Sequence, residues 1–319
     1  MKLARMGFPV KEKLSKYVDA KAEDIYNELE ALLNHTFINV ESEVETYNAC
    51  DGLFDLIDEL NAGGQVGMPL KNCEILNREI GGINFNGNIY GLGANSGVGK
   101  STTAINYLMP SVLEHNEKMV IMINEEDQNK VKKELLIWVA NNIYGAELHK
   151  YVLRDGHFSK EVLSKLYEAA EYLEKLKERR NITIVPFKKY TVKAAIKVIK
   201  KYSSMGVRLF VLDTLKESSD SRNIETWKSM ERDMVDLYDV VKPAAKNVAL
   251  FVTYQLGKAS VKLRYLTNNE IGQAKNILDV FSVNLMMRKP FEDEFPGGSH
   301  EIKAYKLAGK NNSSKIPFY

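Results

Sequence analysis

The chain has 319 residues, of which 45% are hydrophobic, and 44 Lys and Arg residues nearly balance 42 Asp and Glu residues to give a formal net charge of +2. This length suits one large α/β domain with a small appendage. The balanced charge neither requires nor excludes a nucleic-acid partner, so any such site must come from local clusters of Lys and Arg.

No signal peptide, membrane-length apolar run or low-complexity segment is present, which predicts a cytoplasmic protein that makes no membrane contact. Cys50 and Cys73 lack the spacing of metal ligands, and we expect them to be reduced thiols rather than a disulfide.

The first 62 residues carry helical patterns, with apolar residues three and four apart at 11–18, 22–33 and 51–60. Nothing in this part has catalytic spacing. We therefore expect a helical N-terminal segment over 1–62 that serves packing or subunit docking, followed by a larger domain over 63–319.

The rest of the chain is organised around Ile89–Thr103, where a short apolar run enters a Gly-rich turn that ends in Gly-Lys-Ser and opens a helical pattern at Ala104. This is the strand, loop and helix of a P-loop, which binds ATP and Mg²⁺. Lys100 is expected to reach the β- and γ-phosphates, and Ser101 to bind Mg²⁺. The alternative is a Gly-rich turn without nucleotide. The nucleotide-binding residues that we expect are Ala94 (where the strict pattern has Gly), Asn95, Ser96, Gly97, Val98, Gly99, Lys100, Ser101 and Thr102.

An acidic triplet follows the next apolar run, the strand expected at 118–124. Ligands bind at the carboxyl ends of parallel strands, so one carboxylate could polarise the attacking water. The alternative is charge at the start of the helix expected at 128–144, where acids are favoured. Of Glu125, Glu126 and Asp127, we expect Glu125 to be catalytic because it lies closest to the strand.

The pattern then predicts a helix at 159–180, a strand at 181–187, a helix at 191–202 with a Thr cap, and an apolar strand at 207–213 that ends in Asp213. After a P-loop, such a strand is typical of the Walker B motif, whose Asp holds the Mg²⁺ shell. Many buried strands also end in Asp without this role.

A helix at 227–245 precedes the next strand, 248–255, which ends in Gln255. This Gln either contacts the γ-phosphate or is a plain polar residue at a strand end. The loop at 257–275 carries cations that could meet the phosphate backbone of single-stranded DNA or simply face solvent. The DNA-binding candidates are Lys258, Lys262 and Arg264.

Three late strands are expected at 280–287, 301–307 and 315–319, joined by short turns. Strands that alternate with helices predict a mostly parallel sheet, and these late strands predict an antiparallel edge.

The order of motifs resembles the RecA-like motor domain of DnaB-type replicative helicases over roughly residues 63–319, with an N-terminal part more similar to divergent phage-encoded members. The segments that carry the resemblance are Gly67-Met68-Pro69, Leu76-Asn77, Gly81-Gly82-Ile83, Ala94–Ser101, Asn124-Glu125-Glu126, Val211–Leu215 and Thr253–Leu256.

The resemblance implies a homo-hexameric ring with ATP between subunits, single-stranded DNA in the channel, a linker helix near 51–60, and a primase or helicase loader as a further partner in a bacterial host cytoplasm. The family's late Lys-x-Arg, whose Arg reaches the neighbour's γ-phosphate, is Lys306-Leu307-Ala308 here. We expect Lys306, or else Lys310, to replace that Arg; the alternatives are that this cation lies elsewhere in the chain or that both lysines are surface charges on an edge strand. The same phosphate motifs also fit a RecA-like ATPase that does not unwind DNA, such as a recombinase-type or helicase-loading protein, or a subunit that binds nucleotide without turnover.

Overall fold

The computed structural model describes residues 21, 23, 24, 26–32, 49–63, 67–70, 73–178, 181–216, 218, 219, 226–242, 247–271 and 275–294. The chain divides into two compact units, Met1–Ala62 and Gly63–Tyr319, each of which is described by itself. Within the residues described, no helix combines the length and the apolar character that crossing a membrane requires. Cys50 is exposed and Cys73 is partly buried, and the residues described contain no disulfide.

The N-terminal unit contains helical residues at 26–32 and the helix α3 (Leu53–Asn61). The expected helix at 51–60 is confirmed to within two residues, whereas the one at 11–18 lies outside the described residues. Apolar side chains of α3 are exposed, including Phe54 at 86%. This helix therefore presents an apolar stripe rather than burying it within its own unit.

The second unit is built on a six-stranded sheet in the order β3-β2-β4-β5-β1-β6, and every described strand pair in it is parallel. The strands are β1 (Asn88–Ala94), β2 (Met119–Ile123), β3 (Ile182–Pro186), β4 (Leu209–Leu215), β5 (Ala249–Gln255) and β6 (Val283–Met287). The predicted α/β class with a mostly parallel sheet is confirmed.

Most helices of this unit lie between successive strands, and α6, α8, α9 and α10 end within four residues of the predicted bounds. They are α4 (Glu74–Ile80), α5 (Lys100–His115), α6 (Gln128–Asn142), α7 (Lys150–Asp155), α8 (Lys160–Glu178), α9 (Val192–Ser203) and α10 (Thr226–Val241), followed by the 3₁₀ helices η3 (Lys258–Lys262), η4 (Asn268–Ile271), η5 (Lys275–Val280) and η6 (Glu292–Glu294). The expected cap of α9 is confirmed, because the Thr191 side chain accepts a hydrogen bond from the N–H of Ala194 at 3.1 Å.

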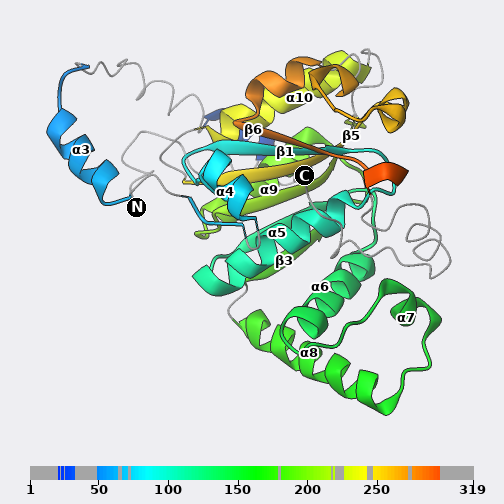
Figure 1. Cartoon of the computed structure of the whole chain (residues 1–319). Coiled ribbons are helices and arrows are strands. Elements are labelled where there is room, and N and C mark those ends of the chain that lie inside the picture. Colours follow the sequence, from blue (N-terminus) through cyan, green and yellow to red (C-terminus); the bar gives the residue numbers. More distant parts are fainter. Residues whose placement is uncertain are drawn as a thin grey trace. The chain divides into compact units, whose positions relative to one another are not determined.

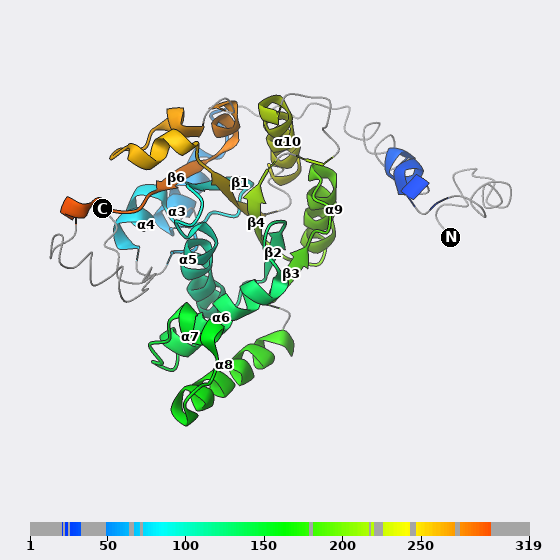
Figure 2. The same ribbon diagram turned by 90° about the vertical axis from the view of Figure 1, so that its right-hand side faces the viewer.

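Both faces of the sheet are covered, which explains why its strands read as continuous apolar runs. Along β4, Leu209 and Val211 join the core under α5, α6 and α8, while Phe210 and Leu212 join the core under α9 and α10. Figure 1 shows α5 and α10 on opposite sides of the sheet, and in Figure 2 α6, α7 and α8 gather beyond α5.

Two features differ from the sequence prediction. The helix α7 lies in a stretch where no element was expected. The strand β6 begins at Val283 rather than 280, because η5 occupies the preceding residues, and it pairs with β1 in parallel rather than forming an antiparallel edge. The strands expected at 301–307 and 315–319 lie outside the described residues.

Candidate active site

The Gly-rich turn between β1 and α5 has the backbone of a phosphate-binding loop. Gly97 and Gly99 have φ of 73° and 113°, a region that glycine enters without strain. A Cβ at either position would meet nothing within 4 Å, so the space around the loop is open. Because α5 starts at Lys100, the N–H groups of its first turn lack helical partners and are free to bind an anion. This geometry fits the phosphates of a nucleotide.

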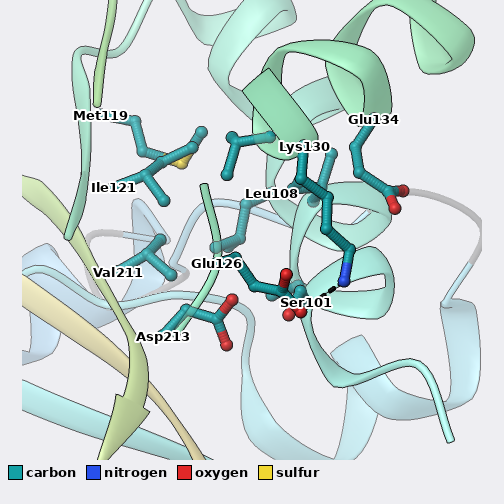
Figure 3. A pocket seen from close by; sticks show the side chains of 12 residues that line it. Ser101, Leu108, Met119, Ile121, Glu126, Lys130, Glu134, Val211 and Asp213 are labelled. Carbon is teal, nitrogen blue, oxygen red and sulfur yellow. Dashed lines mark hydrogen bonds and ion pairs between the residues drawn. The ribbon is translucent and has the colours of Figure 1, made fainter. Parts of the chain in front are cut away.

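A pocket lies beside this loop, between α5, α6, β2 and β4 (Figure 3). Its inner part is apolar and includes Leu108 and Val211. Ser101, Glu126 and Asp213 gather at its other end, where a hydroxyl and two carboxylates face the same space. Oxygen ligands of this kind suit Mg²⁺, which takes one or two protein ligands and completes its shell with phosphate and water. Ser101 and Asp213, the two expected metal ligands, are thus brought together.

The Asp213 carboxylate is held from the neighbouring strand. Thr253 Oγ1 of β5 donates to Asp213 Oδ1 at 2.5 Å, and the hydroxyls of Thr253 and Thr214 are 2.7 Å apart. All three side chains are buried. Asp213 lies within β4 rather than at its end, opposite Ile123 in the register, so the carboxylate is fixed beside the end of β2.

The acidic triplet after β2 divides into different roles. Asp127 caps α6 by accepting a hydrogen bond from the N–H of Asn129 at 3.2 Å, so the structural alternative is correct for this residue. Glu126 pairs with Lys130 one helical turn away. Among the described residues, exposed Glu125 makes no hydrogen bond or ion pair, and it does not line the pocket that Glu126 lines.

Asn124 ties the end of β2 to β4. Its Nδ2 donates to the carbonyl of Thr214 at 2.6 Å, and its Oδ1 accepts from the N–H of Thr214 at 3.2 Å. The backbone that carries Glu125 and Glu126 is therefore held at a fixed position relative to Asp213. No spacing pattern in the sequence identifies the Asn124 side chain as a link between these two strands.

Gln255 lies opposite Ala94 in the register of β5 and β1, so the end of β5 adjoins the start of the phosphate loop. Its side chain is exposed, which leaves the amide free to meet a ligand in front of the sheet. The structure thus brings the expected γ-phosphate contact to the P-loop.

The candidate DNA-binding segment follows directly. Lys258 and Lys262 are exposed on η3, and buried Ser260 between them accepts a hydrogen bond from Asn95 Nδ2 of the P-loop at 2.8 Å. Arg264 is different: it pairs with Asp293 at 2.8 Å, and this hydrogen bond raises the pKa of its guanidinium. Of the three expected cations, the two lysines remain available to a phosphate backbone.

Lys306 and Lys310 lie outside the described residues, so their expected role stays a prediction.

Two contacts at the site could not be predicted from the sequence. The Thr253 contact with Asp213, and a link from Lys150 to Thr102 of the P-loop helix, join residues 40 and 48 positions apart and have no motif.

Comparison with known proteins gives similarity in structure alone. No family model matches the sequence. No curated protein matches it either. A solved structure of an ATPase domain matches with a TM-score of 0.64 and 14% identity, over 80% of this chain and 87% of that one. A DnaB-like replicative helicase, described with its interactions with primase, matches with a TM-score of 0.63 and 14% identity, over 93% of this chain and 68% of that one. The chain therefore has the RecA-like fold of these P-loop ATPases.

Proposed function

We propose that this chain is the ATP-hydrolysing motor of a DnaB-type replicative helicase, which moves along single-stranded DNA as a hexameric ring. One observation carries the proposal. The P-loop, Asp213, the acids after β2 and Gln255 meet at the carboxyl ends of neighbouring parallel strands, on a sheet whose fold is shared with a DnaB-like helicase. The exposed stripe on α3 supports docking of this helix on a neighbouring subunit.

In this proposal the nucleotide is ATP with Mg²⁺, which supplies Lewis-acid stabilisation of the phosphate charge. Lys100 contacts the β- and γ-phosphates, and the N–H groups at the start of α5 bind the phosphate oxygens. Ser101 and Asp213 hold the metal shell, while Gln255 contacts the γ-phosphate.

We assign the general base to Glu125. Asp127 is used as a helix cap and Glu126 is paired with Lys130, whereas Glu125 is exposed at the end of β2 with no partner among the described residues. A base must be free to approach the attacking water in the loaded complex. Glu126, which lines the pocket with Ser101 and Asp213, is the competing carboxylate.

The central test measures ATP hydrolysis and strand unwinding by the full chain and by Lys100→Ala. We expect the variant to lose both activities while keeping its thermal midpoint, because Lys100 is a loop-end residue without a core role. Lys118→Ala is a matched control, since Lys118 is an exposed lysine just before β2. Normal turnover by a folded Lys100→Ala protein contradicts the ATP site. Turnover without unwinding, together with open filaments rather than rings by electron microscopy, favours the recombinase-type alternative.

The choice of base has its own test, in which Glu125→Gln and Glu126→Gln are compared. Glutamine preserves size and hydrogen bonding but accepts no proton, so Glu125→Gln should bind nucleotide normally and hydrolyse it roughly 10²–10⁴-fold more slowly. A large loss in Glu126→Gln with a mild one in Glu125→Gln transfers the role to Glu126.

A further inference from the structure

A lysine from the unexpected helix α7 reaches the P-loop helix. Lys150 Nζ donates a hydrogen bond to Thr102 Oγ1 at 2.6 Å and forms an ion pair with Glu134 of α6. Thr102 Oγ1 in turn donates to Glu134 Oε2 at 3.3 Å. Three helices, α5, α6 and α7, therefore meet at one side chain in the first turn of α5.

The position of Thr102 brings this cation next to the phosphate site. Thr102 directly follows Ser101, and the N–H groups of this first turn face a bound anion. The backbone of a P-loop surrounds the α- and β-phosphates, while its own lysine reaches the β- and γ-phosphates. By this general pattern, an ammonium group bound to the Thr102 hydroxyl would lie nearest the α- and β-phosphates, where the P-loop motif supplies no side-chain cation.

The present partner of Lys150 is a carboxylate that also lies at the site. The Glu134 side chain is 10% exposed and lines the pocket beside Ser101 and Asp213, whereas the Lys150 side chain is 42% exposed. A lysine on a flexible four-carbon stem can exchange one anion for another without moving its helix. A phosphate group of a bound nucleotide would compete with the Glu134 carboxylate for the ammonium group.

We propose that Lys150 is a further nucleotide-binding residue, which leaves Glu134 to contact the α- or β-phosphate of the bound nucleotide. The proposal rests on the ATP site proposed above and adds a cation that none of its motifs contains. It makes α7 a part of the active site, although α7 follows the acidic triplet by more than twenty residues.

The test is a titration of the full chain with fluorescent ADP and ATP analogues in the absence of Mg²⁺. Lys150→Ala should weaken the binding of both nucleotides roughly tenfold, because a hydrogen bond to a charged group is lost. The factor should be the same for ADP and ATP, since both carry the α- and β-phosphates. Lys150→Arg should restore most of the affinity. Lys133→Ala is the matched control: Lys133 and Lys150 both line a second pocket, between α6 and α7, and among the described residues Lys133 has no ion-pair partner.

Glu134→Gln distinguishes a phosphate-binding role of Lys150 from a purely structural role in holding α7. If Lys150 serves the nucleotide, removing the competing charge of Glu134 should leave the affinity unchanged or raise it. If the bridge only holds α7 in place, Glu134→Gln should weaken binding as much as Lys150→Ala does, and the proposal is refuted. The proposal is also refuted if Lys150→Ala binds ADP as tightly as the parent, or if Lys133→Ala loses as much nucleotide affinity as Lys150→Ala. A parent chain that binds neither nucleotide refutes the ATP site itself, and this proposal with it.

Discussion

Replacing Thr253 by Val tests how the structure holds the Walker B carboxylate. Valine has nearly the shape of threonine but no hydroxyl, so the backbone of β5 and the packing around it should persist. What disappears is the 2.5 Å bond to Asp213 and the 2.7 Å contact with the Thr214 hydroxyl. Because all three side chains are buried, water cannot replace the lost partner.

The loss can be sized from these contacts. A hydrogen bond to a carboxylate contributes about 1.5–3 kcal/mol, and a neutral one about 1 kcal/mol. The methyl group that Val adds returns about 0.8 kcal/mol of apolar burial. The expected net destabilisation is about 2–3 kcal/mol, which for a unit of this size lowers the thermal midpoint by roughly 5–10 °C.

Function should change as well, since an Asp213 carboxylate without its donor is free to turn away from the metal. Loss of a group that orients a metal ligand typically costs roughly tenfold or more in metal affinity. We therefore expect ATP hydrolysis by Thr253→Val to need roughly tenfold more Mg²⁺ for half-maximal rate. Thermal melts and Mg²⁺ titrations of the ATPase rate measure the two effects.

Thr253→Ser is the control, because it keeps the hydroxyl and loses only the methyl group. It should retain the Mg²⁺ requirement of the parent. Parent-like melting and Mg²⁺ dependence in Thr253→Val would falsify the claim that this hydroxyl holds Asp213. An equal loss in Thr253→Ser assigns the effect to packing of the methyl group instead.

Three other outcomes follow from the structure. Gly93→Ala should lower the thermal midpoint by several degrees, since its Cβ would lie 2.5–2.6 Å from the buried Tyr254 ring; an unchanged midpoint shows that the ring moves freely. Replacing Lys258 and Lys262 by Ala should weaken binding of a fluorescent dT oligonucleotide and reduce the dependence of its affinity on salt concentration. An unchanged salt dependence shows that η3 faces solvent and does not bind DNA. An inactive P-loop lysine variant mixed with Lys306→Ala should regain hydrolysis if sites are shared between subunits, and mixed assemblies that stay inactive exclude Lys306 as the trans cation.

The P-loop shows what local sequence determines. Its strand, Gly-rich turn and helix start lie within fifteen residues, and Gly97 and Gly99 supply the positive φ values that glycine adopts without strain. The cap at Thr191 is equally local, because the hydroxyl and the N–H that it binds are three residues apart. Periodicity over ten or more residues identified the long helices for the same reason: their pattern is repeated every turn.

Strand order and the direction of β6 were decided by packing. An apolar run predicts a buried strand but does not say which other strands it pairs with. Only the packing of helices on both faces selects β5 and β6 as the partners of β1. The antiparallel expectation for the late strands rested on short turns, whereas η4 and η5 fill the connection that lets β6 run parallel.

The sequence by itself thus determined the chemistry that the site offers: the P-loop lysine and hydroxyl, the acids after β2, and Asp213 on its apolar strand. Tertiary structure decided how these groups are used. It tied Asn124 to Thr214, placed Thr253 against Asp213, and brought Lys150 to the P-loop helix. The physical reason is range. Capping and periodicity act between residues within a few positions, whereas hydrogen bonds across strands and helices join residues whose separation along the chain carries no pattern.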